Sequence, residues 1–148
     1  MTPGTPDYAE RVARSFARQG LMETIGARLA AVRPGEVEIV LEVAGKVSQQ
    51  HGFVHAGAVS SIADSAAGFA GLTVMPAGAG VLTVEFKINL MAPAAGERLI
   101  ARGRVVRAGR TIVVAQAEVD AETDGRRKPV ALLTATLMAV EGRDGVAD

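Results

Sequence analysis

QQHGFVHAGAVSSIADSAAGFAGLTV, residues 49–74, is the stretch around which the rest of the chain is organised. It begins as a loop with two histidines and continues as a predicted helix of small and apolar residues, whose only charge is Asp64. At about 100° per residue, one narrow stripe of this helix holds Gly57, Ser61, Asp64, Gly68 and Gly71, and the opposite side holds Val59, Ile62, Ala66, Phe69 and Ala70. Glycine in a helix interior costs about 1 kcal/mol of stability relative to alanine. Several glycines on one stripe, here called the thin stripe because its side chains are small, therefore predict that another backbone or a ligand approaches the helix closely there.

Length and composition indicate one domain without a strong charge of either sign. The 148 residues suit a single domain with its own core. Lys plus Arg equals Asp plus Glu at 16 each, so no basic surface predicts binding to nucleic acid or to an anionic membrane. The chain has no cysteine, no signal-peptide pattern at its start and no convincing membrane span in the glycine-rich segment 66–84. We therefore expect a cytoplasmic protein with no nucleic-acid or membrane partner.

Alternating apolar and polar residues predict antiparallel strands around the central helix. Strands are expected at 36–43, 84–90, 99–106, 113–120 and 130–140, and segment 21–32, whose pattern is ambiguous, could pair with the first as a hairpin. A short amphipathic helix with Tyr8, Val12 and Phe16 precedes them, and the charged tail from about residue 141 is expected to fray. The expected fold class is α+β, with the long helix on one sheet face. About five strands leave faces and edges uncovered in a monomer, which predicts a homodimer or a larger homo-oligomer.

The segment GFVHAGAVSSIADSAAG contains His55, Gly57 and Asp64 in the order H-x-G-x6-D. It resembles the signature of the PaaI-type acyl-CoA thioesterases of the hotdog-fold superfamily. The later VEFKINLMAPA and GRVVRAGR are similar to the rest of that pattern, and the resemblance covers about residues 36–140. It implies a sheet of five or six strands curled round the central helix, dimers with two sites, and hydrolysis of a coenzyme A thioester without a cofactor.

Two positions depart from that family pattern. Ala56 stands where the family usually has glycine, and Gln49 stands where it usually has asparagine, six residues before the histidine. The first change is tolerable because Ala56 keeps a backbone N–H. The second leaves the role of Gln49 open, since the added methylene moves its amide by roughly one bond length.

The chemistry of thioester hydrolysis assigns roles to two residues of the helix. Water attack on the carbonyl produces an oxyanion, which backbone N–H groups at a helix N-terminus stabilise, and Gly57 lies there. Asp64 is the ionisable group on the helix, and it acts either as general base or as a nucleophile through a mixed anhydride. Seven residues separate the two by roughly 10 Å at 1.5 Å per residue. Antiparallel helices across a two-fold axis would instead place Gly57 of one subunit beside Asp64 of the other, in two shared sites.

Further site residues follow from the resemblance and from charge. Thr83 falls where the family often carries a hydroxyl, which the resemblance implies would hold the attacking water or orient the acid. Strict alternation puts the side chains of Thr83 and Val84 on opposite faces of the sheet. Thr83 therefore reaches the site only if the strand is bulged or both faces are used. For the phosphates of coenzyme A, electrostatics alone favours basic residues of the later strands and loops, namely Arg104, Arg107, Arg110 and the loop 126–128.

Each interpretation has an alternative. Asp64 could serve a buried hydrogen-bond network instead of catalysis. His51 and His55 have the spacing of metal ligands on a helix, but Gly52 lies between them without a third ligand nearby, so we predict a loop hydrogen bond and no metal. The alternative function is a non-catalytic acyl-CoA-binding or sensing module, against which stand the balanced charge and the lack of a helix-turn-helix. The acyl group, and dimer versus tetramer, stay open.

Overall fold

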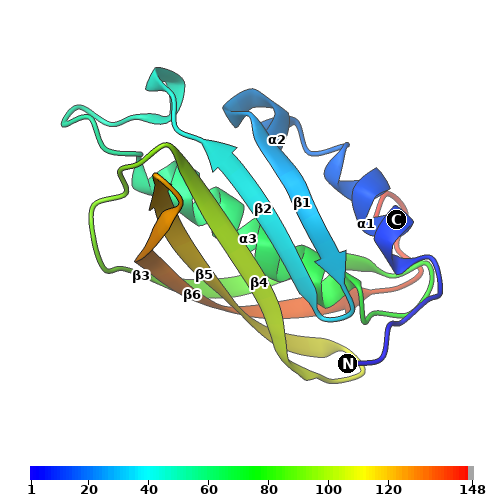
Figure 1. The fold of residues 1–148 in the computed structure, drawn as a ribbon. Coiled ribbons are helices and arrows are strands. Elements are labelled where there is room, and N and C mark those ends of the chain that lie inside the picture. The colour runs from blue at the N-terminus through cyan, green and yellow to red at the C-terminus, as the bar shows by residue number, and fades with distance from the viewer. Residues whose placement is uncertain (147–148) are drawn as a thin grey trace.

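The computed structural model describes residues 1–146, which form one six-stranded antiparallel sheet with a long helix against it (Figure 1). The elements in chain order are α1 (Tyr8–Phe16), α2 (Gly20–Ile25), β1 (Ala27–Arg33), β2 (Glu36–Glu42), the 3-10 turn η1 (Gly45–Val47), α3 (Ala56–Leu72), β3 (Gly80–Leu90), β4 (Arg98–Ala108), β5 (Ile112–Thr123) and β6 (Arg126–Val140). The strand order is β1-β2-β4-β5-β6-β3, so β3 leaves α3 and joins the far edge beside β6. This architecture confirms the predicted α+β hotdog fold.

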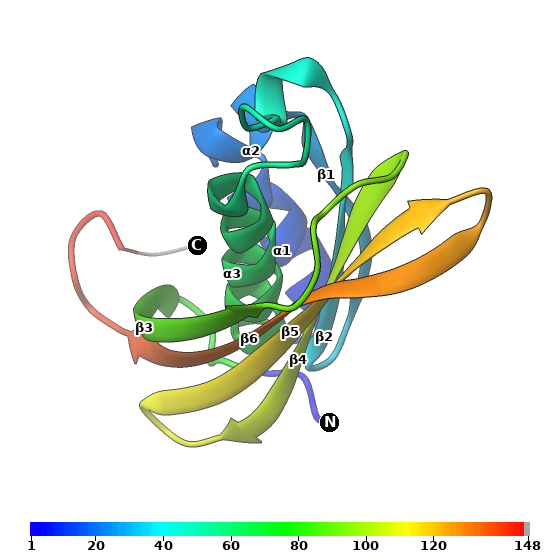
Figure 2. The same cartoon turned by 90° about the vertical axis from the view of Figure 1, so that its left-hand side faces the viewer.

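The central helix α3 lies in the concave face of the curved sheet (Figure 2). The side predicted to be apolar is buried, and its members are Val59, Ile62, Ala66, Phe69 and Ala70. Strand β4 approaches this side so closely that a Cβ at Gly103 would collide with the backbone oxygen of Ala66. On the predicted thin stripe, a Cβ at Gly71 would meet Leu137 at 2.6 Å, whereas a Cβ at Gly68 would meet nothing within 4 Å. The stripe is therefore covered near its C-terminal end and open beside Gly68.

The N-terminal third of the chain covers the other edge of the sheet. The ambiguous segment 21–32 contains most of α2 and β1, and β1 pairs with β2 as the hairpin that the sequence allowed. The predicted amphipathic helix is α1, whose buried Arg11 donates hydrogen bonds to the carbonyl oxygens of Met75 (3.0 Å) and Ala79. Arg11 thus fixes both ends of the loop that leads into β3. None of the helices within residues 1–146 has the length and apolarity needed to cross a membrane.

The C-terminal segment does not fray directly after β6, as was expected from about residue 141. Residues 141–146 turn back, and Arg143 and Val146 form an isolated bridge. Val146 lies against the start of β3, where a Cβ at Gly80 would meet its Cγ1 at 2.8 Å. Residues 147–148 lie outside the described residues.

Strand β3 carries a bulge that decides where its side chains point. Thr83 lies opposite Leu137 of β6, but Glu85 lies opposite Thr136, so Val84 is an extra residue in the ladder. Because Leu137 is buried beneath α3, its partner Thr83 faces the helix. Strict alternation, which would place the Thr83 side chain on the sheet face away from α3, therefore does not hold here. The bulged strand, the alternative that the sequence left open, is observed.

Candidate active site

The predicted acid Asp64 lies half-buried in the middle of α3, against the start of β3. Thr83 Oγ1 donates a hydrogen bond of 2.8 Å to Asp64 Oδ1. Burial raises the pKa of the Asp64 carboxyl above its usual 3.8, and the hydrogen bond from Thr83 partly opposes this rise. Within residues 1–146, Oδ2 receives no hydrogen bond, so one carboxylate oxygen is fixed and the other is open. A carboxylate with a raised pKa accepts a proton more readily than an ordinary aspartate.

Asp64 opens into a cavity of about 410 Å³ between α3, β3 and the end of α1. Phe69 and Val81 form apolar parts of its wall, and Gln19 and Ser65 form polar parts. The C-terminal segment closes one side through Gly145 and Val146. A half-buried carboxylate at a cavity with both apolar and polar walls is the arrangement expected of a small-molecule site.

The N-terminus of α3 presents a different set of groups. His55 is the N-cap, and its Nδ1 accepts a hydrogen bond of 2.8 Å from the N–H of Gly57. This is the local loop hydrogen bond expected of His55, and it occupies the Gly57 amide that was the expected oxyanion donor. The N–H of Ala56 has no acceptor within residues 1–146, so Ala56 supplies the open amide at the helix start.

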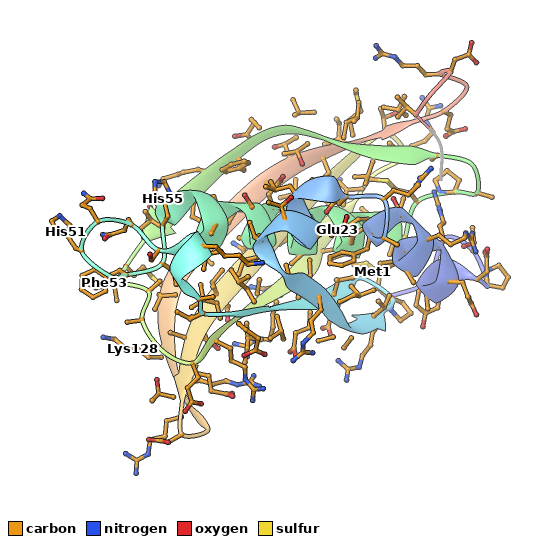
Figure 3. The ribbon with its side chains drawn as sticks, turned by 90° about the horizontal axis from the view of Figure 1, so that it is seen from above. Met1, Glu23, His51, Phe53, His55 and Lys128 are labelled. Atoms are coloured by element: carbon orange, nitrogen blue, oxygen red, sulfur yellow. The ribbon has the colours of Figure 1, made fainter. Side chains whose placement is uncertain are left out.

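Ala56 borders a groove of about 510 Å³ that also contacts Gln49, Phe53 and Leu90. Figure 3 shows Phe53 at the same end of the molecule as His51 and His55. Gln49 shapes the loop here, since its Oε1 accepts from the His51 N–H and its N–H donates to Phe53 O at 2.8 Å. The predicted residue Gln49 thus lies in the same groove as His55 and Ala56.

A second opening, of about 410 Å³, adjoins the first turn of α3 on another side. Gly57 and Ser61 line it together with Lys46, which lies in the turn η1. Lys46 has no signal in the sequence, because an isolated lysine in a turn carries no motif. Within residues 1–146, no three His, Cys, Asp or Glu side chains are grouped as metal ligands.

The two groups of site residues do not meet within one chain. Asp64 and Thr83 share one cavity, whereas Gln49, His55 and Ala56 share another. Ala56 and Asp64 are eight residues apart on one helix, which corresponds to roughly 12 Å. A single protomer therefore holds an acid and an open amide that cannot act together on one carbonyl.

The predicted cations lie away from both cavities. Arg104 is on the outer face of the sheet, because its neighbour Gly103 faces α3, and it donates to Gln116 Oε1 at 2.7 Å. Arg107 and Arg110 are exposed where β4 turns into β5. None of these three arginines lines the cavities beside Asp64 or Ala56. Lys46, in contrast, lines the opening at the first turn of α3.

Comparison with known proteins places the chain in a family. Residues 51–128 match the family model described as "Thioesterase superfamily". A thioesterase family protein from Silicibacter pomeroyi has a crystal structure with a TM-score of 0.89 and 50% identity, covering 91% of this chain and 99% of that one. A 1,4-dihydroxy-2-naphthoyl-CoA hydrolase from Listeria monocytogenes is 28% identical over 71% of this chain and 85% of its own length. The PaaI protein of E. coli, at 20% identity, shares the fold with a TM-score of 0.82, covering 92% of this chain and 95% of that one.

This chain therefore belongs to the thioesterase superfamily. The resemblance inferred from residues 36–140 is confirmed, as is the expected class of enzyme, a thioester hydrolase. The matched residues 51–128 contain Asp64, Thr83 and Ala56, the residues around which the two cavities are built.

Proposed function

We propose that this protein hydrolyses acyl-CoA thioesters at two equivalent sites, each formed by Asp64 and Thr83 of one protomer and the partner's Ala56. The observation that carries the proposal is the state of Asp64: half-buried, with a raised pKa, fixed by Thr83 and open to a cavity. Membership of the thioesterase superfamily supports the reaction, and the naphthoyl-CoA hydrolase of Listeria supports a coenzyme A thioester as the substrate. We also infer a cytoplasmic location, since a cysteine-free chain suits a reducing compartment.

The free edge of β3 supports the shared site. Within residues 1–146 this edge pairs with no other strand, and it exposes Val84, Phe86 and Leu90. Unpaired apolar edges are unfavourable in water and favour association with a second copy. Antiparallel pairing of two β3 strands about their middle would place the Leu90 end of one beside the Thr83 end of the other. Because Leu90 lines the groove at Ala56, the same pairing would carry the partner's Ala56 toward Asp64.

The proposed reaction uses each group once. Asp64 Oδ2 takes a proton from water, whose oxygen attacks the thioester carbon, while Thr83 holds Oδ1. The partner's Ala56 N–H stabilises the oxyanion that forms. The intermediate then collapses with cleavage of the C–S bond, and coenzyme A leaves as a thiol with the proton from Asp64. Direct attack by Asp64 to give a mixed anhydride, followed by its hydrolysis, uses the same carboxylate.

The proposal is tested by measuring release of free thiol from a panel of acyl-CoA substrates. Asp64→Asn should lower kcat/KM by roughly 10³-fold, within the range typical of a lost general base. Asp124→Asn, the same substitution in the β5–β6 turn, should leave it unchanged. Full turnover by Asp64→Asn would disprove the assigned role, and tight binding without turnover by the wild type would favour the non-catalytic binding module.

A further inference from the structure

Arg11 is a buried cation on α1 that holds the loop between α3 and β3. The residue is 3% exposed, its Nη1 donates a hydrogen bond of 3.0 Å to Met75 O, and its Nη2 donates to Ala79 O. A guanidinium loses much of its hydration when it is buried, and these two carbonyl oxygens compensate for part of that loss. The planar guanidinium presents two nitrogens in a fixed plane, so a lysine would not replace the contact in full.

The two elements that Arg11 joins both line the cavity that holds the proposed base. On α1, Ser15 lies one turn after Arg11 and is part of the cavity wall. On the other side of the contact, β3 begins directly after Ala79, and its residues 80–83 line the same cavity. Arg11 therefore links two walls of the cavity through the loop 75–79.

The contact between Thr83 and Asp64 is sensitive to small movements of β3. Thr83 is the fourth residue after Ala79, and the backbone between them belongs to β3. A strand is close to the greatest length that its backbone allows, so a displacement of its first residues is passed along it. The hydrogen bond from Thr83 to Asp64 is 2.8 Å long, and a shift of less than about 1 Å would break it.

We propose, on the basis of the function above, that Arg11 is a positioning residue, which sets the separation of Thr83 and Asp64 by holding the start of β3. Within residues 1–146, Arg11 is not part of the cavity wall, so it acts through Thr83 and not on the substrate. The hydrogen bond from Thr83 lowers the pKa of the Asp64 carboxyl. Releasing the loop weakens this bond and raises that pKa further, so the base is ionised only at higher pH.

The attachment of α1 to the rest of the protein has a separate source. Val12 is fully buried, and Phe16 packs against Phe69 of α3 with ring centroids 5.9 Å apart. Val12→Ala should therefore weaken the packing of α1 and lower Tm without releasing the loop, which makes it the control for a merely structural effect. Arg14→Lys is the matched control for the loss of a guanidinium, since Arg14 is exposed on the same helix.

The inference is tested by titrating the Asp64 carboxyl by NMR and by measuring kcat/KM against pH. Arg11→Lys should raise the carboxyl pKa and move the acidic limb to higher pH, with a roughly three- to tenfold loss of kcat/KM below the limb's midpoint and little change above it. Combined with Thr83→Val, it should cause no further shift, because both substitutions act on one hydrogen bond. Val12→Ala and Arg14→Lys should leave the pKa and the limb in place.

An unchanged or lowered carboxyl pKa in Arg11→Lys would overturn the inference. An equal shift in Val12→Ala, or a further shift in the double variant, would overturn it as well. Arg11→Gln takes the place of Arg11→Lys if the latter does not fold. Failure of the proposed function is a separate outcome: if Asp64→Asn keeps full turnover, the NMR titrations of the wild type and Arg11→Lys still decide whether Arg11 positions Thr83.

Discussion

The two halves of the proposed site differ in how far one chain completes them. The acid half is finished within the protomer, because the hydrogen bond between Thr83 and Asp64 joins β3 to α3. The donor half is a backbone amide at Ala56, on an exposed helix end, and nothing in residues 1–146 accepts its hydrogen bond. One protomer therefore contains both halves separately, and in the proposed site they come together only when two protomers associate through β3. Substitutions can accordingly disturb one half and leave the other in place.

The donor half can be broken by Ala56→Pro, which removes one N–H. Proline is favoured at the first position of a helix, and His55 already has the φ of −60° and ψ of 137° that suit the residue before a proline. We expect kcat to fall by roughly 10²- to 10³-fold, as for other lost oxyanion donors. Ala56→Ser, which keeps the N–H, should stay near the wild type in the same thiol-release assay. If the Ala56→Pro enzyme stays active, the oxyanion donor would instead be the N–H of Gly57.

Combining the two inactive variants in one dimer tests whether each site is shared between two protomers. Ala56→Pro and Asp64→Asn should each be nearly inactive as homodimers. When they are co-expressed, we expect mixed dimers in which one site has both intact groups, so a statistical mixture should recover about a quarter of wild-type activity. Failure to recover activity in purified mixed dimers would place each site within one chain.

The acid half was easier to predict from the sequence than its surroundings. Asp64 stands out as a lone charge on an apolar helix, and both the periodicity and the strand alternation depend only on neighbours in the chain. The bulge at Val84 inserts one residue into a pattern of period two, and the alternation of apolar side chains continues through it unchanged. The side on which Thr83 lies therefore required the pairing of β3 with β6.

The donor half was predicted one residue away from where the structure leaves an open amide. Gly57 was favoured because it lies at the N-terminus of the predicted helix, but the His55 side chain accepts a hydrogen bond from its N–H. Which of two successive amides a cap occupies depends on the rotamer of His55, which spacing does not encode. Gln19 was missed because its contact with Ser65 spans 46 residues and is made by a helix junction without a motif.

Removing the hydrogen bond between Thr83 and Asp64 should lower activity less than removing the Asp64 carboxylate or the Ala56 N–H. Thr83→Val deletes the hydrogen bond that lowers the pKa of Asp64 and keeps the shape of the side chain. The base must be ionised, so activity is lost as the pH falls through this pKa. Because the pKa would rise further, the acidic limb of the kcat/KM profile should move to higher pH, with roughly a tenfold loss below the limb's midpoint. Thr134→Val, on the exposed face of β6, should leave the profile in place.

The smallest effect is expected from the cation nearest the donor half. Lys46 is exposed beside Gly57 and Ser61, where it could meet a phosphate of coenzyme A, whereas Arg104 lies on the outer face and bonds Gln116. An exposed ion pair contributes up to about 1 kcal/mol, so Lys46→Ala should raise KM by roughly threefold without changing kcat, and the difference should shrink in high salt. Arg104→Ala should not change KM. A raised KM for Arg104→Ala with an unchanged KM for Lys46→Ala would instead place the phosphates of coenzyme A on the outer face of the sheet, away from the Ala56 N–H.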